Sequence, residues 1–389
     1  KNFLINISLI LSSIYLPLII FSSYENFRKH NTSRARIVRK RIKDYDIPQK
    51  ISAINAGFIP TYLPDSILKE QKPISIYPIG SLPKTRSYLC NEGHGFGLIT
   101  YLTDRFGLRN KDEKWLNINN KSNIFVIGDS HIHGYCVTEN FTIPSILEKS
   151  NNLNSINLAS GSNSPYEYMA ILKSIVMPIV NDTQEEQIVI VAFYANDHIA
   201  SHPERYKLID SIKPILEKTS EGISPSYHYT NSLKIFINKN YPQPSKEVIL
   251  NTRKKTFKQT SFYSNLTISP IRKKLKILLS RNTPSQSSSQ LSSQSPSEKT
   301  ISLLSEICKD RCKPFVVYIP NSTFWDPMSN SEDYKPELKE MSKTMGIPFI
   351  DGSKVINGSN REDFAPKGPH LSLKGYKKLA DFINNKILD

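Results

Sequence analysis

Cysteine is scarce in this sequence. Its 389 residues include only four, and so small a number suits a reducing compartment as well as one or two disulfide bonds. Two of them, Cys308 and Cys312, are separated by three residues, and no second pair of metal ligands lies nearby. We therefore interpret these two as ordinary helix residues and expect no zinc site. The other two are Cys90 and Cys136.

The sequence also lacks a phosphate-binding loop. Residues 93–97 read Gly-His-Gly-Phe-Gly, but no strand pattern precedes them, the GxGxxG spacing is absent and no Lys-Ser or Lys-Thr pair follows. Nucleotide phosphates are held by loops that have those features. We therefore interpret this stretch as a turn, and no cofactor is expected.

Acidic residues are missing from two basic segments. Residues 28–43 hold eight basic residues and residues 253–281 hold nine, with no Asp or Glu in either. These seventeen account for the net charge of +16, because 34 basic and 35 acidic residues remain elsewhere. The body of the protein is therefore close to neutral. Aromatic residues are not interleaved through both runs as on a nucleic-acid-binding surface, although Phe257, Phe262 and Tyr263 occur in the second, so no nucleic-acid partner is expected.

Charge is absent again from residues 3–24, which are mostly apolar. About 20 apolar residues suffice for a helix that crosses a bilayer. A cleaved signal peptide would have a shorter apolar region and a small-residue cleavage site, which Ser22-Ser23 matches poorly. We predict one uncleaved transmembrane helix at residues 1–24, with the basic flank at the lipid headgroups. Because the basic residues follow the span, the charge rule favours the cytoplasmic side for the rest of the chain.

The most informative stretch is residues 124–134. Four apolar residues, three of them β-branched, run directly into Gly-Asp-Ser. This pattern predicts a strand buried on both faces that ends in a tight loop. Ser130 then lies just beyond the carboxyl end of a strand, which is where open α/β sheets bind their ligands. An ordinary turn with an exposed serine is the alternative.

Strand and helix patterns alternate from residue 123 onward. Continuous apolar strands separated by helices indicate a parallel sheet covered on both faces. We therefore predict an α/β fold, a flavodoxin-like three-layer α/β/α sandwich with about five parallel strands. The predicted strands are residues 124–129, 155–159, 187–194, 314–320 and 348–351, and the predicted helices are residues 143–150, 165–180, 301–312, 336–345 and 373–388.

Two less regular regions complete the predicted organisation. Residues 25–122 form a basic juxtamembrane segment and an irregular extension of short strands laid over a domain edge. Residues 123–389 form the main domain, with a long insertion at residues 198–299. Its end, residues 282–299, is mainly Ser, Gln and Pro and is predicted to be disordered. The basic residues before it form either a solvated lid or a helix on an anionic membrane surface.

Four short motifs follow the predicted strands or precede the last helix. They are Gly128-Asp-Ser130, Asn157-Leu-Ala-Ser-Gly161-Ser162, Ala195-Asn196-Asp197 and Gly368-Pro-His370. Taken together, they resemble the GDSL/SGNH hydrolase family, in which a serine, a glycine, an asparagine and a histidine come in this order. The resemblance covers residues 123–389 without the insertion. Residues 101–110 are similar to a bacterial membrane-associated branch of the same family.

The resemblance implies catalytic roles. Ser130 would be the nucleophile and His370 the base that takes its proton. The backbone N–H groups of Ser130 and of Gly161 or Ser162, with the amide of Asn196, would form the oxyanion hole. The family glycine normally occupies the position of Ser162, so Gly161 is one residue early.

The most serious departure concerns the acid. The family has an acidic residue three positions before the histidine, where this chain has Lys367. Asp363, seven residues before His370, is our candidate for the acid, and a Ser-His dyad is the alternative. We interpret His131 and His133 as packing or substrate contacts, and no metal is expected.

We therefore predict a membrane-anchored serine esterase or acyltransferase that acts through an acyl-enzyme on Ser130. Its expected substrate is an acyl ester, with a cell-surface polysaccharide as the candidate carrier. The resemblance favours the exported, periplasmic or extracellular side of the membrane, against the charge rule, and we favour that side. The alternative, suggested by Lys367, is a catalytically degenerate module that binds a glycan or lipid at the membrane.

Overall fold

The computed structural model describes residue 17 and residues 47–70, 76–116, 118–197, 209, 215–220, 222–241, 295–325 and 331–388. Apart from Pro17, all of these belong to one compact unit, made of Tyr45–Pro244 and Gln294–Asp389. The predicted membrane helix, except for Pro17, and both basic runs lie outside the described residues. Within the described part of the chain, every helix is too short or too polar to cross a membrane.

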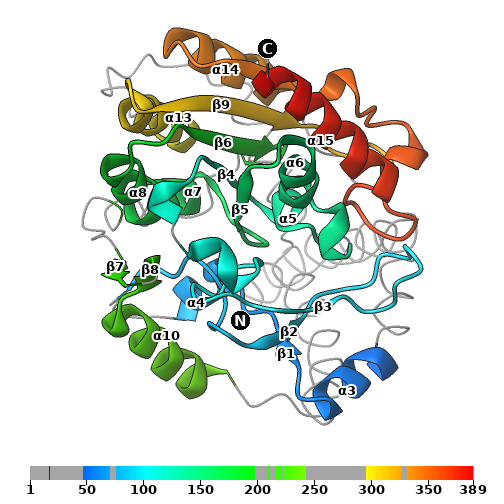
Figure 1. Ribbon diagram of the computed structural model, residues 1–389. Coiled ribbons are helices and arrows are strands. Elements are labelled where there is room, and N and C mark those ends of the chain that lie inside the picture. The colour runs from blue at the N-terminus through cyan, green and yellow to red at the C-terminus, as the bar shows by residue number, and fades with distance from the viewer. Residues whose placement is uncertain are drawn as a thin grey trace, which may run out of the picture. The chain divides into compact units, whose positions relative to one another are not determined.

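A sheet of five parallel strands forms the centre of this unit (Figure 1). The strands lie in the order β10-β9-β6-β4-β5, and all four pairs in this sheet are parallel. The prediction of an α/β fold with five parallel strands is therefore confirmed. The strands are β4 (Asn123–Gly128), β5 (Asn154–Ala159), β6 (Gln187–Tyr194), β9 (Cys312–Ile319) and β10 (Phe349–Asp351).

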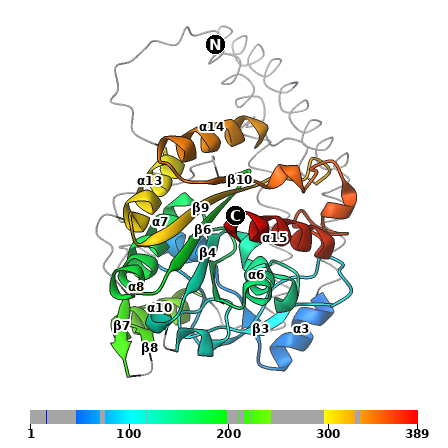
Figure 2. The same ribbon diagram turned by 45° about the horizontal axis from the view of Figure 1, so that its top comes forward.

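Helices cover both faces of the sheet (Figure 2). On one face, α6 (Ile143–Asn151) contacts α15 (Leu373–Leu388). A second group of helices covers the other face, and α13 (Pro296–Cys308) contacts each of the other members of this group. Every residue of β4 and β6 is buried as a result, which explains why these strands are continuously apolar in sequence. The other members of the second group are α7 (Pro165–Ile171), α8 (Met177–Asp182) and α14 (Ser331–Thr344), with the π-helical turn η4 (Leu172–Val176) joining α7 to α8.

The bounds of α13 correct the predicted helix at residues 301–312. Ser295 caps the helix by accepting a hydrogen bond from the backbone N–H of Glu298, and Pro296 occupies the first turn, so the helix begins five residues earlier than predicted. It ends at Cys308, which forms a disulfide with Cys312 at the start of β9. Our interpretation of both cysteines as helix residues was therefore wrong for Cys312. The helix start also shows that residues 295–299 are ordered, unlike our prediction.

Residues 45–122 of the predicted extension belong to the same compact unit as the central sheet. The extension forms a three-stranded sheet of β1 (Ile59–Pro60), β2 (Arg86–Tyr88) and β3 (Thr100–Leu102). Part of the insertion packs against it, because the backbone N–H of Ile79 donates to the hydroxyl of Tyr229. Among the described residues, the remaining strands and α-helices are α3 (Ile47–Asn55), α4 (Pro64–Glu70), β7 (Leu216–Thr219), β8 (Gly222–Pro225), α5 (Ser130–His133) and α10 (Tyr227–Asn240).

Asp104 ties the extension to the central sheet. One of its carboxylate oxygens accepts the N–H groups of Phe106 and Leu108, and the other accepts Asn110 Nδ2 and Trp115 Nε1. Asn110 in turn exchanges two hydrogen bonds with the backbone of Asn157 in β5. Burial raises the pKa of Asp104 to about 6, and the four donors oppose that rise.

We expect Asp104→Asn to lower the free energy of unfolding by about 2–4 kcal/mol, because the new amide cannot accept all four hydrogen bonds and each buried donor left unpaired costs about 1–3 kcal/mol. Urea denaturation followed by circular dichroism measures the effect. Glu113→Gln, at an exposed position in the short helix Asp112–Trp115, is the control and should be neutral. Equal stability of the two variants would contradict this role of Asp104.

Candidate active site

Ser130 lies at the carboxyl end of β4, at the first position of α5. Asp129 caps this short helix, because its side chain accepts the backbone N–H of His131 at 2.9 Å. Gly128 allows the chain to turn so tightly, since a Cβ there would lie 2.5 Å from Cγ1 of Ile132. Gly134, at φ 77°, ends the helix in the left-handed conformation. The Gly-Asp-Ser motif thus presents Ser130 partly exposed at the edge of the sheet.

His370 faces Ser130. Its Nε2 lies 3.0 Å from Ser130 Oγ, although the two residues are 240 positions apart in sequence. The loop that carries His370 is closed by the bridge between Phe364 and Leu371, and the backbone N–H of Ala365 donates to the carbonyl of His370 at 2.7 Å. The structure therefore brings together the two residues that the sequence analysis named as nucleophile and base.

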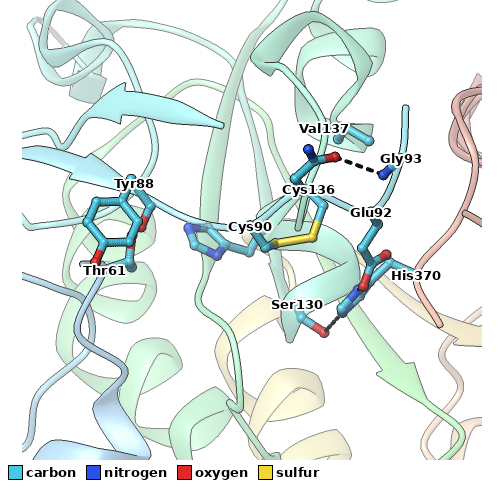
Figure 3. The surroundings of a disulfide bond; sticks show 12 residues. Thr61, Tyr88, Cys90, Glu92, Gly93, Ser130, Cys136, Val137 and His370 are labelled. Carbon is cyan, nitrogen blue, oxygen red and sulfur yellow. Dashed lines mark hydrogen bonds and ion pairs between the residues drawn. A yellow bond between two sulfur atoms is a disulfide. The ribbon is translucent and has the colours of Figure 1, made fainter. Parts of the chain in front are cut away.

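A carboxylate occupies the other side of the His370 ring, and it belongs to Glu92 (Figure 3). Glu92 Oε1 lies 2.8 Å from His370 Nδ1, and the two side chains are only 11% and 12% exposed. A carboxylate at this distance holds the proton on Nδ1, which leaves Nε2 to accept the hydroxyl proton of Ser130. The three side chains form a Ser-His-Glu hydrogen-bond chain.

The prediction that Asp363 orients His370 was therefore wrong. One oxygen of Asp363 accepts Lys378 Nζ at 2.6 Å, and the other accepts the backbone N–H of Asn357 at 3.0 Å. Asp363 is 1% exposed, so its carboxylate is fully engaged in the anchoring of α15 and the preceding loop. Closeness in sequence to His370 did not determine the direction in which this side chain points.

Glu92 reaches the site on a hairpin from the extension. Leu89, Cys90 and Ile99 continue the β2–β3 pairing past the strand ends, through hydrogen bonds from Leu89 N to Ile99 O and from Ile99 N to Cys90 O. Residues 93–97, predicted to be a turn, form its tip. The hairpin contacts the His370 loop, since the backbone N–H of Lys367 donates to the carbonyl of Glu92 at 3.0 Å.

Gly368 leaves room for the carboxylate of Glu92. A Cβ at position 368 would lie 1.8 Å from the carboxyl carbon of Glu92. The residue at the family's acid position, Lys367, thus contributes a backbone N–H to the hairpin that supplies the acid. The sequence analysis missed Glu92, because a lone glutamate beside a glycine-rich turn carries no local signal of a role 278 positions away.

The predicted oxyanion residues lie at the ends of the strands that flank β4. Gly161 is buried and Ser162 is exposed with φ 63°, just after β5, while Asn196 is exposed just after β6. The register pairs Gly128 with Ala159, so β4 and β5 end level, whereas β6, which pairs Val191 with Ile127, continues to Tyr194 and ends beyond them at the same edge of the sheet.

Two side chains hold these loops in place. Asn163 Nδ2 donates to the carbonyl of Gly128 at 3.3 Å. Asp197 accepts the backbone N–H of Tyr194 and the hydroxyl of Tyr168, both at 2.9 Å. Burial keeps the pKa of Asp197 well above its ordinary value. The loops after β5 and β6 are thereby fixed beside Ser130.

Buried aromatic rings surround the triad. His131 stacks on Tyr194 with 4.2 Å between ring centroids and lies 5.1 Å from the His370 ring, while the ring of Tyr135 lies 5.0 Å from that of His370. Burial lowers the pKa of His131, and it lowers the pKa of His133 to about 3. Both imidazoles are therefore neutral at neutral pH, and they place no positive charge beside His370.

Glu92, Cys136 and His370 come close enough to be considered as metal ligands, and they are the one such group of three within the described residues. The sulfur of Cys136 is bonded to Cys90, so it is not a thiolate. Both ring nitrogens of His370 already face protein partners. We therefore assign Glu92 and His370 to the hydrogen-bond chain with Ser130, not to a metal site.

Neither a family model nor a curated protein matches this sequence. The chain is structurally similar to members of the GDSL/SGNH family. A lipolytic protein of the G-D-S-L family from Veillonella parvula is 12% identical at a TM-score of 0.36, with 68% of this chain and 97% of that chain covered. A GDSL-like lipase from Bacteroides thetaiotaomicron is 9% identical at a TM-score of 0.33, with 72% of this chain and 90% of that chain covered. An aryl esterase from M. smegmatis is 11% identical at a TM-score of 0.32, with 69% of this chain and 98% of that chain covered.

We expect acid to destabilise the fold through its buried histidines. Below pH 6.5 the unfolded chain binds a proton on His133 that the folded chain does not bind, so the contribution of His133 to the free energy of unfolding becomes less favourable from pH 6.5 towards pH 3, opposite in sign to that of the carboxyl of Asp104. At pH 5 this residue alone accounts for about 2 kcal/mol. Urea denaturation between pH 5 and 7 measures the slope. His133→Gln should flatten it and His228→Gln, at an exposed position, should not; an unchanged slope in His133→Gln would contradict the prediction.

Proposed function

We propose that this protein is a serine hydrolase of the GDSL/SGNH type that cleaves esters through an acyl-enzyme on Ser130. The observation that carries the proposal is the chain of hydrogen bonds from Glu92 through His370 to Ser130, with distances of 2.8 and 3.0 Å. A nucleophile, a base and a group that orients the base, all within hydrogen-bond distance, are the geometric requirements of this chemistry.

In the first step Ser130 Oγ attacks the carbonyl carbon of the ester, and its proton passes to His370 Nε2. Glu92 stabilises the imidazolium that results. The tetrahedral intermediate then releases the alcohol, which takes the proton from Nε2, and the acyl group remains on Ser130. Water repeats the sequence and releases the carboxylic acid. General-base help of this kind contributes roughly 10²- to 10⁴-fold to the rate.

The oxyanion of the intermediate needs hydrogen-bond donors at the same edge of the sheet. We assign this role to the backbone N–H groups of Ser130 and of Gly161 or Ser162, and to the side-chain amide of Asn196. Their support is the strand order, in which β4 lies between β5 and β6 and all three are parallel, so the loops that follow them leave the same edge of the sheet. Loss of one such donor typically costs about 10²- to 10³-fold.

We further propose that the domain acts on the exported side of a membrane. Both disulfides, Cys90–Cys136 and Cys308–Cys312, support this location, because disulfides persist in oxidising compartments. An acyl group on a cell-surface glycan is the substrate that fits such a location, and transfer to a second alcohol in place of water would make the same site an acyltransferase. The alternative, a catalytically degenerate binding module, was suggested by the lack of an acidic residue three positions before His370. In the structure Glu92 supplies a carboxylate to His370.

Ser130→Ala should abolish two activities together. We expect it to lose hydrolysis of p-nitrophenyl acetate and covalent labelling by a fluorophosphonate probe, because both need the hydroxyl of Ser130. Hydrolysis is followed by absorbance and labelling by intact-protein mass spectrometry, with circular dichroism to confirm the fold. Wild-type turnover in this variant would remove the proposal.

Glu92→Gln tests the identity of the acid. We expect kcat to decrease by about 10²- to 10⁴-fold, because an amide does not hold the His370 proton on Nδ1 as a carboxylate does. Asp363→Asn is the matched comparison: it should lower the melting temperature through loss of its pairing with Lys378 and leave kcat near the wild-type value. The opposite ranking of the two kcat values would show that Asp363 is the acid.

A further inference from the structure

The disulfide Cys90–Cys136 connects the two loops from which the site is built (Figure 3). Cys90 lies two residues before Glu92 on the hairpin of the extension. Cys136 lies six residues after Ser130, in the turn that follows α5. The bond therefore fastens the loop of the acid to the segment of the nucleophile.

Apart from the disulfide, the hairpin that carries Glu92 is held by non-covalent contacts, among them the hydrogen bond from Asn91 Nδ2 to Gln49 Oε1 and the ring contact of Phe96 with Phe141. The hairpin continues the pairing of two three-residue strands, and its tip at Gly95 and Phe96 is exposed. Its backbone is tied to the His370 loop through the bond from Lys367 N to Glu92 O. Short strands with an exposed tip open at low free-energy cost, so a covalent link near Glu92 has a large effect on where the carboxylate lies.

The backbone at Cys136 is a second reason to expect this effect. Cys136 has a φ of 61°, a left-handed conformation that is strained for a residue with a Cβ. Its neighbour Tyr135 packs on Gly161, where a Cβ would lie 2.6 Å from the tyrosine ring, and its ring is 5.0 Å from that of His370. A cysteine released from the disulfide is free to leave the left-handed region, and it then no longer holds Cys90 and the hairpin of Glu92 beside this part of the site.

We propose that the Cys90–Cys136 disulfide is a positioning element of the triad, so that ester hydrolysis depends on its oxidation state. The inference rests on the proposed hydrolase function. A dithiol reductant converts the disulfide into two thiols, with two electrons and two protons transferred from the reductant, which becomes a disulfide itself. Glu92 is then held against His370 by non-covalent contacts alone, and the fraction of molecules with a complete triad decreases.

The second disulfide provides a matched control. Cys308–Cys312 joins the end of α13 to the amino end of β9, whereas the triad lies at the carboxyl edge of the sheet. The described residues contain no free cysteine, so these two bonds account for all four. Replacement of either cysteine pair removes one disulfide, but only the Cys90–Cys136 bond joins loops of the site.

The experiment compares Cys90→Ala/Cys136→Ala with Cys308→Ala/Cys312→Ala, each in the wild-type and in the Glu92→Gln background. Hydrolysis of p-nitrophenyl acetate gives kcat and KM, and the rate of fluorophosphonate labelling gives the reactivity of Ser130. We expect the first pair to lower kcat by about 10- to 100-fold with little change in KM, a part of the roughly 10⁴-fold that a misplaced acid can cost. The second pair should leave kcat unchanged.

The Glu92→Gln background distinguishes positioning from general stability. If the disulfide acts through Glu92, its removal from Glu92→Gln should cause little further loss. Dithiothreitol should lower kcat of the wild type and of Cys308→Ala/Cys312→Ala by the same factor, and it should not affect Cys90→Ala/Cys136→Ala. Should the latter fail to fold, wild type and Glu92→Gln with and without dithiothreitol give the same comparison.

Wild-type kcat in folded Cys90→Ala/Cys136→Ala would overturn the inference, and so would an equal fold-loss on disulfide removal with and without Glu92. Both outcomes leave the hydrolase proposal intact. An absence of Ser130-dependent hydrolysis and labelling in the oxidised wild type would instead overturn the hydrolase proposal. The two failures are therefore separate.

Discussion

The hydrogen bond between Glu92 and His370 determines what this site can do. A neutral imidazole carries one proton on either of two nitrogens, and only the form with the proton on Nδ1 leaves Nε2 to accept from Ser130. Glu92 Oε1, at 2.8 Å, selects that form, and the low exposure of both side chains keeps water from competing. The nearby imidazoles of His131 and His133 are held neutral by burial, so His370 is the histidine in this cluster that is placed to carry charge.

Two structural layers with different properties meet at this bond. Ser130 and the loops of Gly161 and Asn196 extend from a sheet whose central strands are completely buried, and such a sheet gives a rigid edge. Glu92 comes from a hairpin of the small peripheral sheet. The extension that forms this sheet is joined to the main sheet through the hydrogen bonds of Asn110 with Asn157 of β5, and to the segment after Ser130 through the Cys90–Cys136 disulfide. The position of Glu92, which orients His370, therefore depends on how the peripheral sheet is attached, whereas the position of Ser130 does not.

The carboxylate beside His370 comes from a different part of the chain than the GDSL/SGNH pattern implies. Lys367 stands where the GDSL/SGNH pattern has an acid, yet the backbone at 367 and the missing side chain at Gly368 both accommodate the hairpin that carries Glu92. The chemistry requires a carboxylate within hydrogen-bond distance of Nδ1 and places no condition on the element that supplies it. A carboxylate supplied from outside the loop of His370 is thus compatible with a complete triad.

Local sequence patterns determined the five strands, the helices between them and the place of Ser130, because buried strands are continuously apolar and functional loops follow their carboxyl ends. The role of His370 followed from the resemblance of the four motifs to the GDSL/SGNH family. The same patterns misplaced the start of α13 and the acid, and they left the pairing of the four cysteines open. Glu92 and Asp363 are both single carboxylates in irregular segments, and nothing local distinguishes them. Only the tertiary structure decided between them, because a contact between residues 278 positions apart depends on the path of the whole chain and leaves no periodic signal in either segment.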